Sequence, residues 1–224
     1  MIEIVSKTKD YIIIFKPCGM PSQSDPTGDV DAMTALKQIL KDGGEREELY
    51  LIHRLDRVVG GLLVFARNKQ SAALLSSLVA DRLLDKEYYA VVEGTLEGGV
   101  MTDYIYKDSS LGKAFVTDRK RLGVKDAELE YSTLATVKVE ERSLSLVKVK
   151  LKTGRFHQIR VQFASRKMPL IGDKKYGSRD FKAKTPSLFA TSLSFGFKGK
   201  RISESRLPDL ESYPWSLFEK ESFK

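Results

Sequence analysis

Cysteine and histidine are scarce in this sequence, and their scarcity excludes several kinds of site. The 224 residues contain one cysteine, Cys18, and two histidines, His53 and His157. One cysteine forms no disulfide within the chain and no clustered thiolate zinc site, and two histidines are too few for a multi-histidine metal site. Because no histidine is near it in sequence, Cys18 is interpreted as a small apolar residue rather than a nucleophile. We expect no metal site.

Long apolar runs and nucleotide-binding glycine motifs are also missing. The longest wholly apolar run is far shorter than the ~20 residues that span a bilayer. The opening residues, MIEIVSKTKDYIII, indicate strand, turn and strand rather than a secretory leader. No G-x-x-x-x-G-K-[ST] phosphate loop occurs. These absences predict a soluble, cytoplasmic protein that does not contact a membrane.

Positive charge is in excess and is concentrated in two segments. The formal net charge is +8, and residues 107–125 and 165–184 carry much of the excess. Both segments contain glycine and serine and separate strongly apolar stretches, so both are expected to be exposed loops. Such charge favours a polyanionic partner, RNA or DNA, although it can also serve only solubility.

Strand patterns outnumber helix patterns. Apolar residues recur at helical spacing in three stretches, residues 31–42, 71–84 and 156–166, and the tail after Pro208 is expected to form a short closing helix. Strands are expected through most of the remainder, with hairpins turning at residues 140–143 and 198–200. The long β-rich second half predicts an α+β fold with a mixed, mostly antiparallel sheet.

One carboxylate lies between two cations in the stretch LYLIHRLDRVVGGLLVFAR, residues 49–67. The stretch is expected to form strand, loop and strand. In an extended segment Arg54 and Asp56 share one face, and His53 and Leu55 share the other with Arg57. A nearby cation lowers the pKa of a carboxyl and keeps it ionised, as a nucleophile requires. The alternative is a structural salt bridge that fixes the loop.

Five motifs in order resemble those of the RluA-type pseudouridine synthases. They span roughly residues 10–195, nearly the whole chain. They are KPCGMPS (16–22), HRLDRVVGGLLVFAR (53–67), KEYYAVVEG (86–94), LKTGRFHQIRVQF (151–163) and PLIGDKKYG (169–177). The resemblance implies a uridine isomerase that acts on structured ribosomal or transfer RNA.

The resemblance also implies an architecture and a reaction. The chain is expected to be a single catalytic domain over residues 1–224, with halves of roughly 1–100 and 101–224, flanking helices, a central cleft and no accessory RNA-binding domain. Asp56 is implied to be the nucleophile, attacking either the sugar or the ring of a uridine that is flipped out of the RNA. Substrate and product are isomers, so no cofactor is expected. We expect a monomer.

The family pattern assigns roles to further residues. Tyr88 matches the active-site tyrosine, which stacks on the uracil, whereas its neighbour Tyr89 points the opposite way. Arg160 matches the basic partner of the aspartate, on one helical face with His157. Arg54 either fills the space left by the flipped base or binds phosphate.

Four other residues are expected near the substrate. Arg155 is interpreted as a phosphate or substrate contact. His53 is either a packed residue or a substrate contact, and His157 and Gln158 are expected to position the nucleotide or the loop. Asp173 is expected to cap a turn and fix its loop.

The sequence departs from the family pattern after Arg57. Val58, Val59, Gly60 and Gly61 stand where the family usually has Asp-Thr-Ser-Gly. The loss of two hydroxyl groups removes hydrogen bonds that can stiffen the nucleophile loop. One rival hypothesis is therefore a catalytically inactive RNA-binding or ribosome-assembly protein on the same fold. A second is a glycosylase, which would release free uracil.

Overall fold

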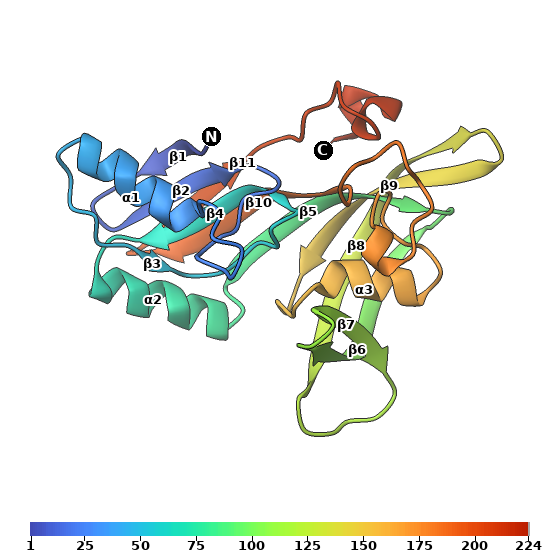
Figure 1. The fold of residues 1–224 in the computed structure, drawn as a ribbon, viewed down its shortest axis with the longest axis horizontal. Coiled ribbons are helices and arrows are strands. Elements are labelled where there is room, and N and C mark those ends of the chain that lie inside the picture. The colour runs from blue at the N-terminus through green and yellow to red at the C-terminus, as the bar shows by residue number, and fades with distance from the viewer. Residues whose placement is uncertain (224) are drawn as a thin grey trace. The chain divides into compact units, whose positions relative to one another are not determined.

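A computed structural model describes residues 1–223 of the chain. These residues form two compact units (Figure 1). The first unit consists of Met1–Lys86 together with Ala190–Arg206, and the second consists of Glu87–Phe189 together with the residues from Leu207 onward. The chain therefore leaves the first unit and later returns to it.

The first unit is a sheet with two helices. Its strands lie in the order β1-β2-β4-β10, with β3 paired to β4 and β11 paired to β10. The pairings of β1 with β2, β2 with β4, β3 with β4 and β10 with β11 are antiparallel. The elements are β1 (Glu3–Lys7), β2 (Tyr11–Lys16), α1 (Ala32–Asp42), β3 (Tyr50–Leu51), β4 (Gly60–Ala66), α2 (Lys69–Ala80), most of β10 (Leu188–Phe197) and β11 (Lys200–Ser205).

Local signals place the two helices of the first unit. The Asp31 carboxylate accepts hydrogen bonds from Met33 N at 2.9 Å and Thr34 N at 3.0 Å, which caps α1. The predicted helix over 71–84 is wrong at its end, because α2 stops at Ala80. Arg82 has a φ of 59°, outside the helical region, and the chain enters a strand at Leu84.

Gly61 allows a close approach between two strands of the first unit. Its φ is +130°, and a Cβ at this position would lie 2.2 Å from Ala190 O and 2.6 Å from Ala190 N. Both contacts are with backbone atoms, which cannot move aside as a flexible side chain can. Gly61 is the second residue of β4, the buried strand that follows Asp56, so the position of that strand depends on the absence of a side chain here.

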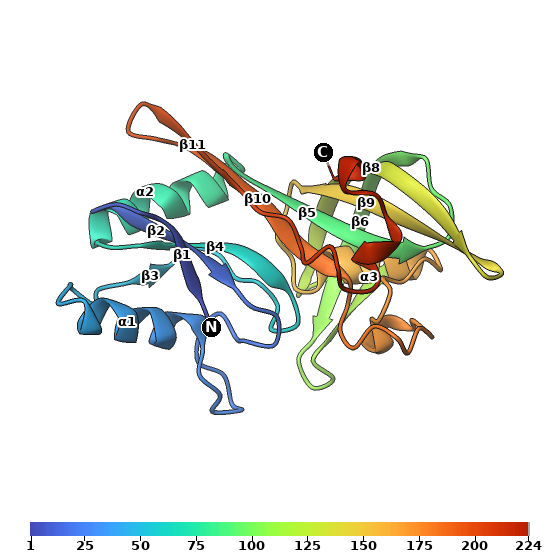
Figure 2. The same ribbon diagram turned by 90° about the horizontal axis from the view of Figure 1, so that it is seen from above.

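The second unit is an antiparallel sheet in the order β5-β9-β8-β6-β7, with helix α3 against β6 and β7. Figure 2 shows its long β8–β9 hairpin, which turns at Glu140 with a φ of 55°. The elements are most of β5 (Leu84–Glu93), β6 (Gly98–Asp108), β7 (Lys113–Thr117), β8 (Val124–Val139), β9 (Arg142–Leu151), α3 (Gln158–Ser165), η1 (Lys174–Tyr176), η2 (Trp215–Leu217) and η3 (Lys220–Ser222).

The predicted mixed, mostly antiparallel α+β fold is confirmed. The expectation that residues 107–125 form one exposed loop is wrong, because they contain β7. Ala114 of that strand is fully buried in a cluster with Val161 and Tyr176. The expected closing helix is a pair of short 3₁₀ turns, η2 and η3. None of the helices among residues 1–223 has the length and apolar character needed to cross a bilayer.

Candidate active site

Asp56 lies in an irregular segment between β3 and β4 of the first unit. Arg54 is exposed and Leu55 is buried, as the expected alternation of faces requires. Among the described residues Arg54 makes no hydrogen bond or ion pair. Its guanidinium is therefore available to an incoming ligand. Asp56 itself is half-buried.

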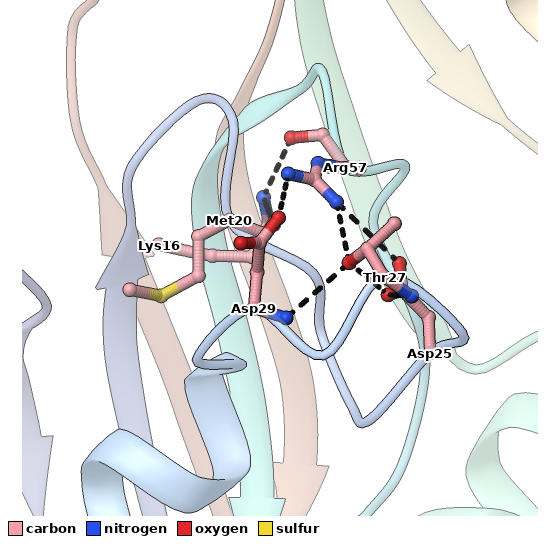
Figure 3. Close-up of polar contacts among 6 residues, drawn as sticks. All are labelled: Lys16, Met20, Asp25, Thr27, Asp29 and Arg57. Atoms are coloured by element: carbon pink, nitrogen blue, oxygen red, sulfur yellow. Dashed lines mark hydrogen bonds and ion pairs between the residues drawn. The ribbon is translucent and has the colours of Figure 1, made fainter.

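The Arg57 side chain binds the loop at residues 25–29, whereas the sequence suggested that it flanks the Asp56 carboxylate. Its guanidinium donates to Thr27 Oγ1 at 2.8 Å, pairs with the Asp29 carboxylate and lies 3.9 Å from Asp25 Oδ2 (Figure 3). The chain turns at residues 57–58, so Arg57 does not continue the alternation of an extended segment. The sequence suggested that two cations hold Asp56 between them, and this is wrong for Arg57. The Arg57 guanidinium instead anchors the loop at residues 25–29.

Residues 16–22, which we call the clamp segment, hold the backbone on both sides of Asp56. Ser22 Oγ donates to Leu55 O at 2.9 Å and accepts from Leu55 N at 3.1 Å. Gly19 N donates to Arg57 O at 2.8 Å. The residues immediately before and after Asp56 are thus both fixed by hydrogen bonds from a segment more than thirty positions earlier in the chain.

The clamp segment also reaches the residues that depart from the family pattern. The Cys18 thiol donates to Val58 O at 3.0 Å, and Val59 N closes a turn on Asp56 O at 3.0 Å. These contacts restrain the loop although no Thr or Ser hydroxyl is present at positions 58–61. Cys18 is exposed and its thiol makes a hydrogen bond, whereas the sequence suggested only a small apolar residue.

Lys16 is the clamp residue that sequence reasoning passed over. Its side chain is fully buried, and Nζ donates to Met20 O at 2.7 Å and Arg57 O at 3.4 Å (Figure 3). Nζ also donates to Pro17 O at 3.1 Å. Burial lowers the pKa of Lys16 to about 8, against the opposing influence of Cys18 and Asp56. The K-P-x-G-x-P motif was visible in the sequence, but the burial of its lysine was not.

Replacing Lys16 with methionine is expected to lower the free energy of unfolding by about 2 kcal/mol, because three carbonyl groups lose a charged donor. The folded fraction should keep kcat within about tenfold, since Gly19 and Ser22 still hold the loop. Urea unfolding and kinetics at saturating RNA measure the two effects. Lys125→Met, at an exposed strand position, is the control. Equal stability of both variants would contradict the clamp role.

His53 is enclosed in the first unit. Both of its ring nitrogens are buried and have no hydrogen-bond partner among the described residues. Burial, assisted by the positive charge of Lys86, lowers the pKa of His53 to about 3. The imidazole is therefore neutral near pH 7. This placement favours packing over substrate contact for His53.

Arg160 and Asp173 form a buried ion pair in the second unit. Arg160 Nε lies 2.7 Å from Asp173 Oδ2, and Nη2 lies 2.8 Å from Oδ1, so the two side chains meet in a forked arrangement. The guanidinium also stacks over the Tyr176 ring at 5.1 Å. Asp173 therefore fixes the loop through an ion pair, and its side chain makes no helix-capping hydrogen bond. Sequence reasoning did not find this partner of Arg160.

His157 precedes α3 and is not part of it. It occupies the left-handed region with a φ of 53°, and its ring stacks on Phe156 at 3.8 Å. Nδ1 lies 2.9 Å from the Tyr176 hydroxyl oxygen, and that oxygen accepts a hydrogen bond from Ala114 N at 2.8 Å. Burial, followed by the charge of Arg160, lowers the pKa of His157 to about 3. The expected common helical face of His157 and Arg160 is not formed.

The lowered pKa values of His53 and His157 both predict that the stability of the fold decreases at acidic pH. Their pKa values are about 3 in the folded protein and ~6.5 in an unfolded chain. Between those values the unfolded chain binds more protons, so stability is present above ~6.5 and is lost as the pH falls toward 3. From pH 7 to pH 5 the free energy of unfolding should fall by about 2 kcal/mol through His53 alone.

Urea unfolding at both pH values measures this loss. His53→Phe and His157→Phe should each reduce the difference between pH 7 and pH 5, whatever their effect on absolute stability. If the free energy of unfolding falls by the same amount from pH 7 to pH 5 in the wild-type protein and in both variants, the neutral, buried state of the two rings is contradicted.

Gln158 and Arg155 stabilise the turn that leads into α3. Gln158 is buried, and its Oε1 accepts from Thr153 Oγ1 at 2.8 Å and from Arg155 N at 3.0 Å, while Nε2 donates to Glu128 O at 3.0 Å. Arg155 Nε donates to Asp126 O at 2.7 Å from a half-exposed position. Gln158 thus positions the turn, and Arg155 keeps an accessible side chain.

Tyr88 and Tyr89 occupy successive positions on β5, opposite Val149 and Lys148 of β9. Successive strand residues point to opposite faces. Both tyrosines are buried, and Tyr89 packs edge-on against Phe223 with ring centroids 5.3 Å apart. Tyr89 is therefore a core residue.

The candidate residues are distributed over both units, with His53, Arg54 and Asp56 in the first unit and the others in the second. Residues 1–223 hold no group of three or more His, Cys, Asp or Glu side chains arranged to bind a metal ion.

Comparison with known proteins identifies the family. The family model for RNA pseudouridylate synthase matches residues 10–165. An uncharacterized RNA pseudouridine synthase of Aquifex aeolicus is 35% identical over 79% of this chain and 56% of its own length. A tRNA pseudouridine synthase C of Vibrio parahaemolyticus is 28% identical over 79% of this chain and 74% of its own. The chain thus spans little more than half of the Aquifex relative.

A solved structure agrees in fold. The structure of human RNA Pseudouridylate Synthase Domain Containing 4 matches with a TM-score of 0.75, covering 92% of this chain and 89% of that one at 24% identity. Similarity at that level of identity supports the fold alone. The family model, however, covers well over half of the sequence and includes the Asp56 loop, β5 and α3. The chain belongs to the RNA pseudouridylate synthase family.

Proposed function

We propose that this protein isomerises a specific uridine to pseudouridine in ribosomal or transfer RNA, acting in the cytoplasm as a monomer. The observation that carries the proposal is Asp56, which stands in the family motif and is restrained on both sides by the clamp segment. A relative named for transfer RNA and another named for the ribosomal large subunit, from Xylella fastidiosa at 30% identity, support the two substrate classes.

The proposed reaction needs one nucleophile and no net change in composition. The target nucleotide is flipped out of its RNA at a cost of a few kcal/mol. The Asp56 carboxylate attacks either the sugar or the uracil ring, and the bond between C1′ and N1 breaks. The uracil rotates, a bond forms between C1′ and C5, and the proton on C5 leaves as N1 gains one. No redox carrier or nucleotide is consumed.

Other residues have proposed roles in the same reaction. Arg160 is the basic partner of the nucleophile, oriented by its ion pair with Asp173. Tyr88 stacks on the uracil. Arg54, exposed and without a described partner, fills the space of the flipped base. Arg155 contacts a phosphate.

Mapping of pseudouridine in RNA from cells with and without the gene tests the proposal. One or a few uridines should lose the modification without the gene, and the purified protein should restore it in that RNA. Free uracil should not appear. Release of uracil would support a glycosylase, and unchanged pseudouridine in both RNA samples would support the inactive RNA-binding alternative.

A further inference from the structure

The segment that contains η1 buries both of its acidic side chains. Between residues 166 and 187 the sequence contains two acidic residues, Asp173 and Asp180. Asp173 is 1% exposed in its pair with Arg160. Asp180 is 2% exposed, and its Oδ2 accepts from Tyr213 OH at 2.6 Å and Arg142 Nη2 at 3.1 Å. No acidic side chain is left on the outside of this segment.

The basic side chains of the same segment point outward. We call residues 174–184 the basic loop. Its exposed cations are Lys174, Lys175, Arg179, Lys182 and Lys184. Five positive charges on so short a segment, with no exposed negative charge between them, give a local field suited to a polyanion.

An aromatic side chain is displayed among these cations. Phe181 is 78% exposed, which makes it the most exposed aromatic residue among those the structure describes. Lys174 Nζ lies 5.5 Å from the centre of its ring. An exposed phenylalanine forgoes the stabilisation that burial gives. Its ring face is therefore accessible to a ligand.

The basic loop is fixed, so it presents Phe181 in a defined place. The Asp180 Oδ1 atom accepts from Lys182 N at 3.0 Å and Ala183 N at 3.1 Å, which holds the backbone on the far side of Phe181. Gly172 has a φ of +79°, and a Cβ there would lie 2.4 Å from Thr185 O, so the two ends of the loop pack closely. A preorganised element loses little conformational entropy when it binds.

We propose that the basic loop docks a single-stranded part of the substrate RNA, with Phe181 stacked on an unpaired base and the surrounding cations on the flanking phosphates. The combination of an exposed aromatic face with one sign of charge matches the chemistry by which proteins hold unpaired nucleotides. A protein partner with an apolar patch would not require five uncompensated cations. This inference rests on the proposed function, since it deepens the recognition of RNA by the same enzyme.

The ion pair between Arg160 and Asp173 connects RNA docking at the basic loop with the proposed reaction. Asp173 immediately precedes the basic loop and also holds Arg160. The residue that orients the proposed basic partner of the nucleophile is therefore joined directly to the loop that is proposed to bind RNA. Phe181 is in this sense a positioning residue for the RNA rather than a catalytic one.

Phe181→Trp turns the proposed stacking contact into a fluorescent reporter. The natural chain has one tryptophan, Trp215, which is buried and supplies the baseline in the wild-type protein. The variant is titrated with an oligouridylate of about ten nucleotides and, separately, with a blunt RNA duplex of about twelve base pairs. Single-stranded RNA should quench the added fluorescence, and the duplex should bind without quenching it.

Affinity measurements separate stacking from charge. Phe181→Ala should weaken binding of the oligouridylate about 5- to 150-fold, the equivalent of ~1–3 kcal/mol for one lost base stack. Phe181→Leu, which keeps an apolar side chain but has no planar face, should behave like alanine. Both should leave the salt dependence of binding unchanged, whereas Lys182→Gln with Lys184→Gln should reduce its slope by ~1.4, the value for two phosphate contacts with a single strand.

Two results would overturn the inference. One is wild-type affinity of Phe181→Ala, or an absence of quenching, with the oligouridylate. The other is full affinity in Phe181→Leu, which would indicate a general apolar contact instead of stacking. Pseudouridine formation by the wild-type protein is measured in parallel. If it persists while either result is found, the docking inference fails and the proposed function stands.

Discussion

Replacing Asp56 with asparagine is expected to lower kcat for pseudouridine formation by at least about 1,000-fold. The amide has nearly the same shape as the carboxylate, but it carries no negative charge and does not act as the nucleophile. The dissociation constant for RNA should stay within about threefold or become smaller, because a negative charge has been removed near the phosphates. Kinetics with excess RNA and a direct binding assay separate the two quantities.

Asp29→Asn is the matched control for this prediction. Asp29 belongs to the neighbouring loop, is exposed and pairs with Arg57. An exposed ion pair contributes little to stability, and Asp29 has no proposed part in the chemistry. It should retain activity. If Asp56→Asn is as active as Asp29→Asn, Asp56 takes no part in the reaction. If both variants lose activity equally, the substitutions disturb the two loops in general.

The second large effect is expected from Asp173→Asn. This change leaves the shape of the side chain but takes the negative charge from a pair in which Arg160 is 5% and Asp173 1% exposed. Removing one partner of a buried ion pair costs about 3–5 kcal/mol, because the remaining charge loses its compensation inside the protein. The free energy of unfolding should fall by that amount, and kcat should fall as Arg160 loses its orientation.

Asp126→Asn tests whether the loss of stability is specific to a buried ion pair. Asp126 pairs with Lys120 at 3.5 Å, and both side chains are more than half exposed. The expected loss there is below about 1 kcal/mol. Urea unfolding followed by the fluorescence of Trp215, in the same unit as Asp173, compares the variants. Similar losses at Asp126 and Asp173 would contradict a special role for the buried pair.

Local patterns in the sequence predicted much of the fold. The glycines after α1, the alternation in β9 and the hairpin turn at Lys198–Gly199 are signals that neighbouring residues supply. The strand β7 was missed because its few residues lie within a charged, glycine-containing segment. The burial of its Ala114 depends on α3, about fifty positions later in the sequence. Local composition carries no information about that contact.

The candidate site divides in the same way. The motif placed Asp56, and alternation along an extended segment correctly separated exposed Arg54 from buried Leu55. The side chains that hold the site were not predictable. Lys16 and Ser22 reach the Asp56 loop across more than thirty residues, and Asp173 reaches Arg160 from a loop beyond α3. Tertiary packing determines those partners, and it leaves no periodic pattern of residues in the sequence.

The most direct measurement of the central claim is the release of tritium from RNA that carries [5-³H]uridine. Bond formation between C1′ and C5 expels the hydrogen on C5, so each isomerisation should deliver one tritium to water and leave one pseudouridine in the RNA. The wild-type protein should release tritium in that ratio, and Asp56→Asn should release none above background. Release that persists in Asp56→Asn, or tritium recovered in free uracil, would contradict an isomerase that depends on this carboxylate.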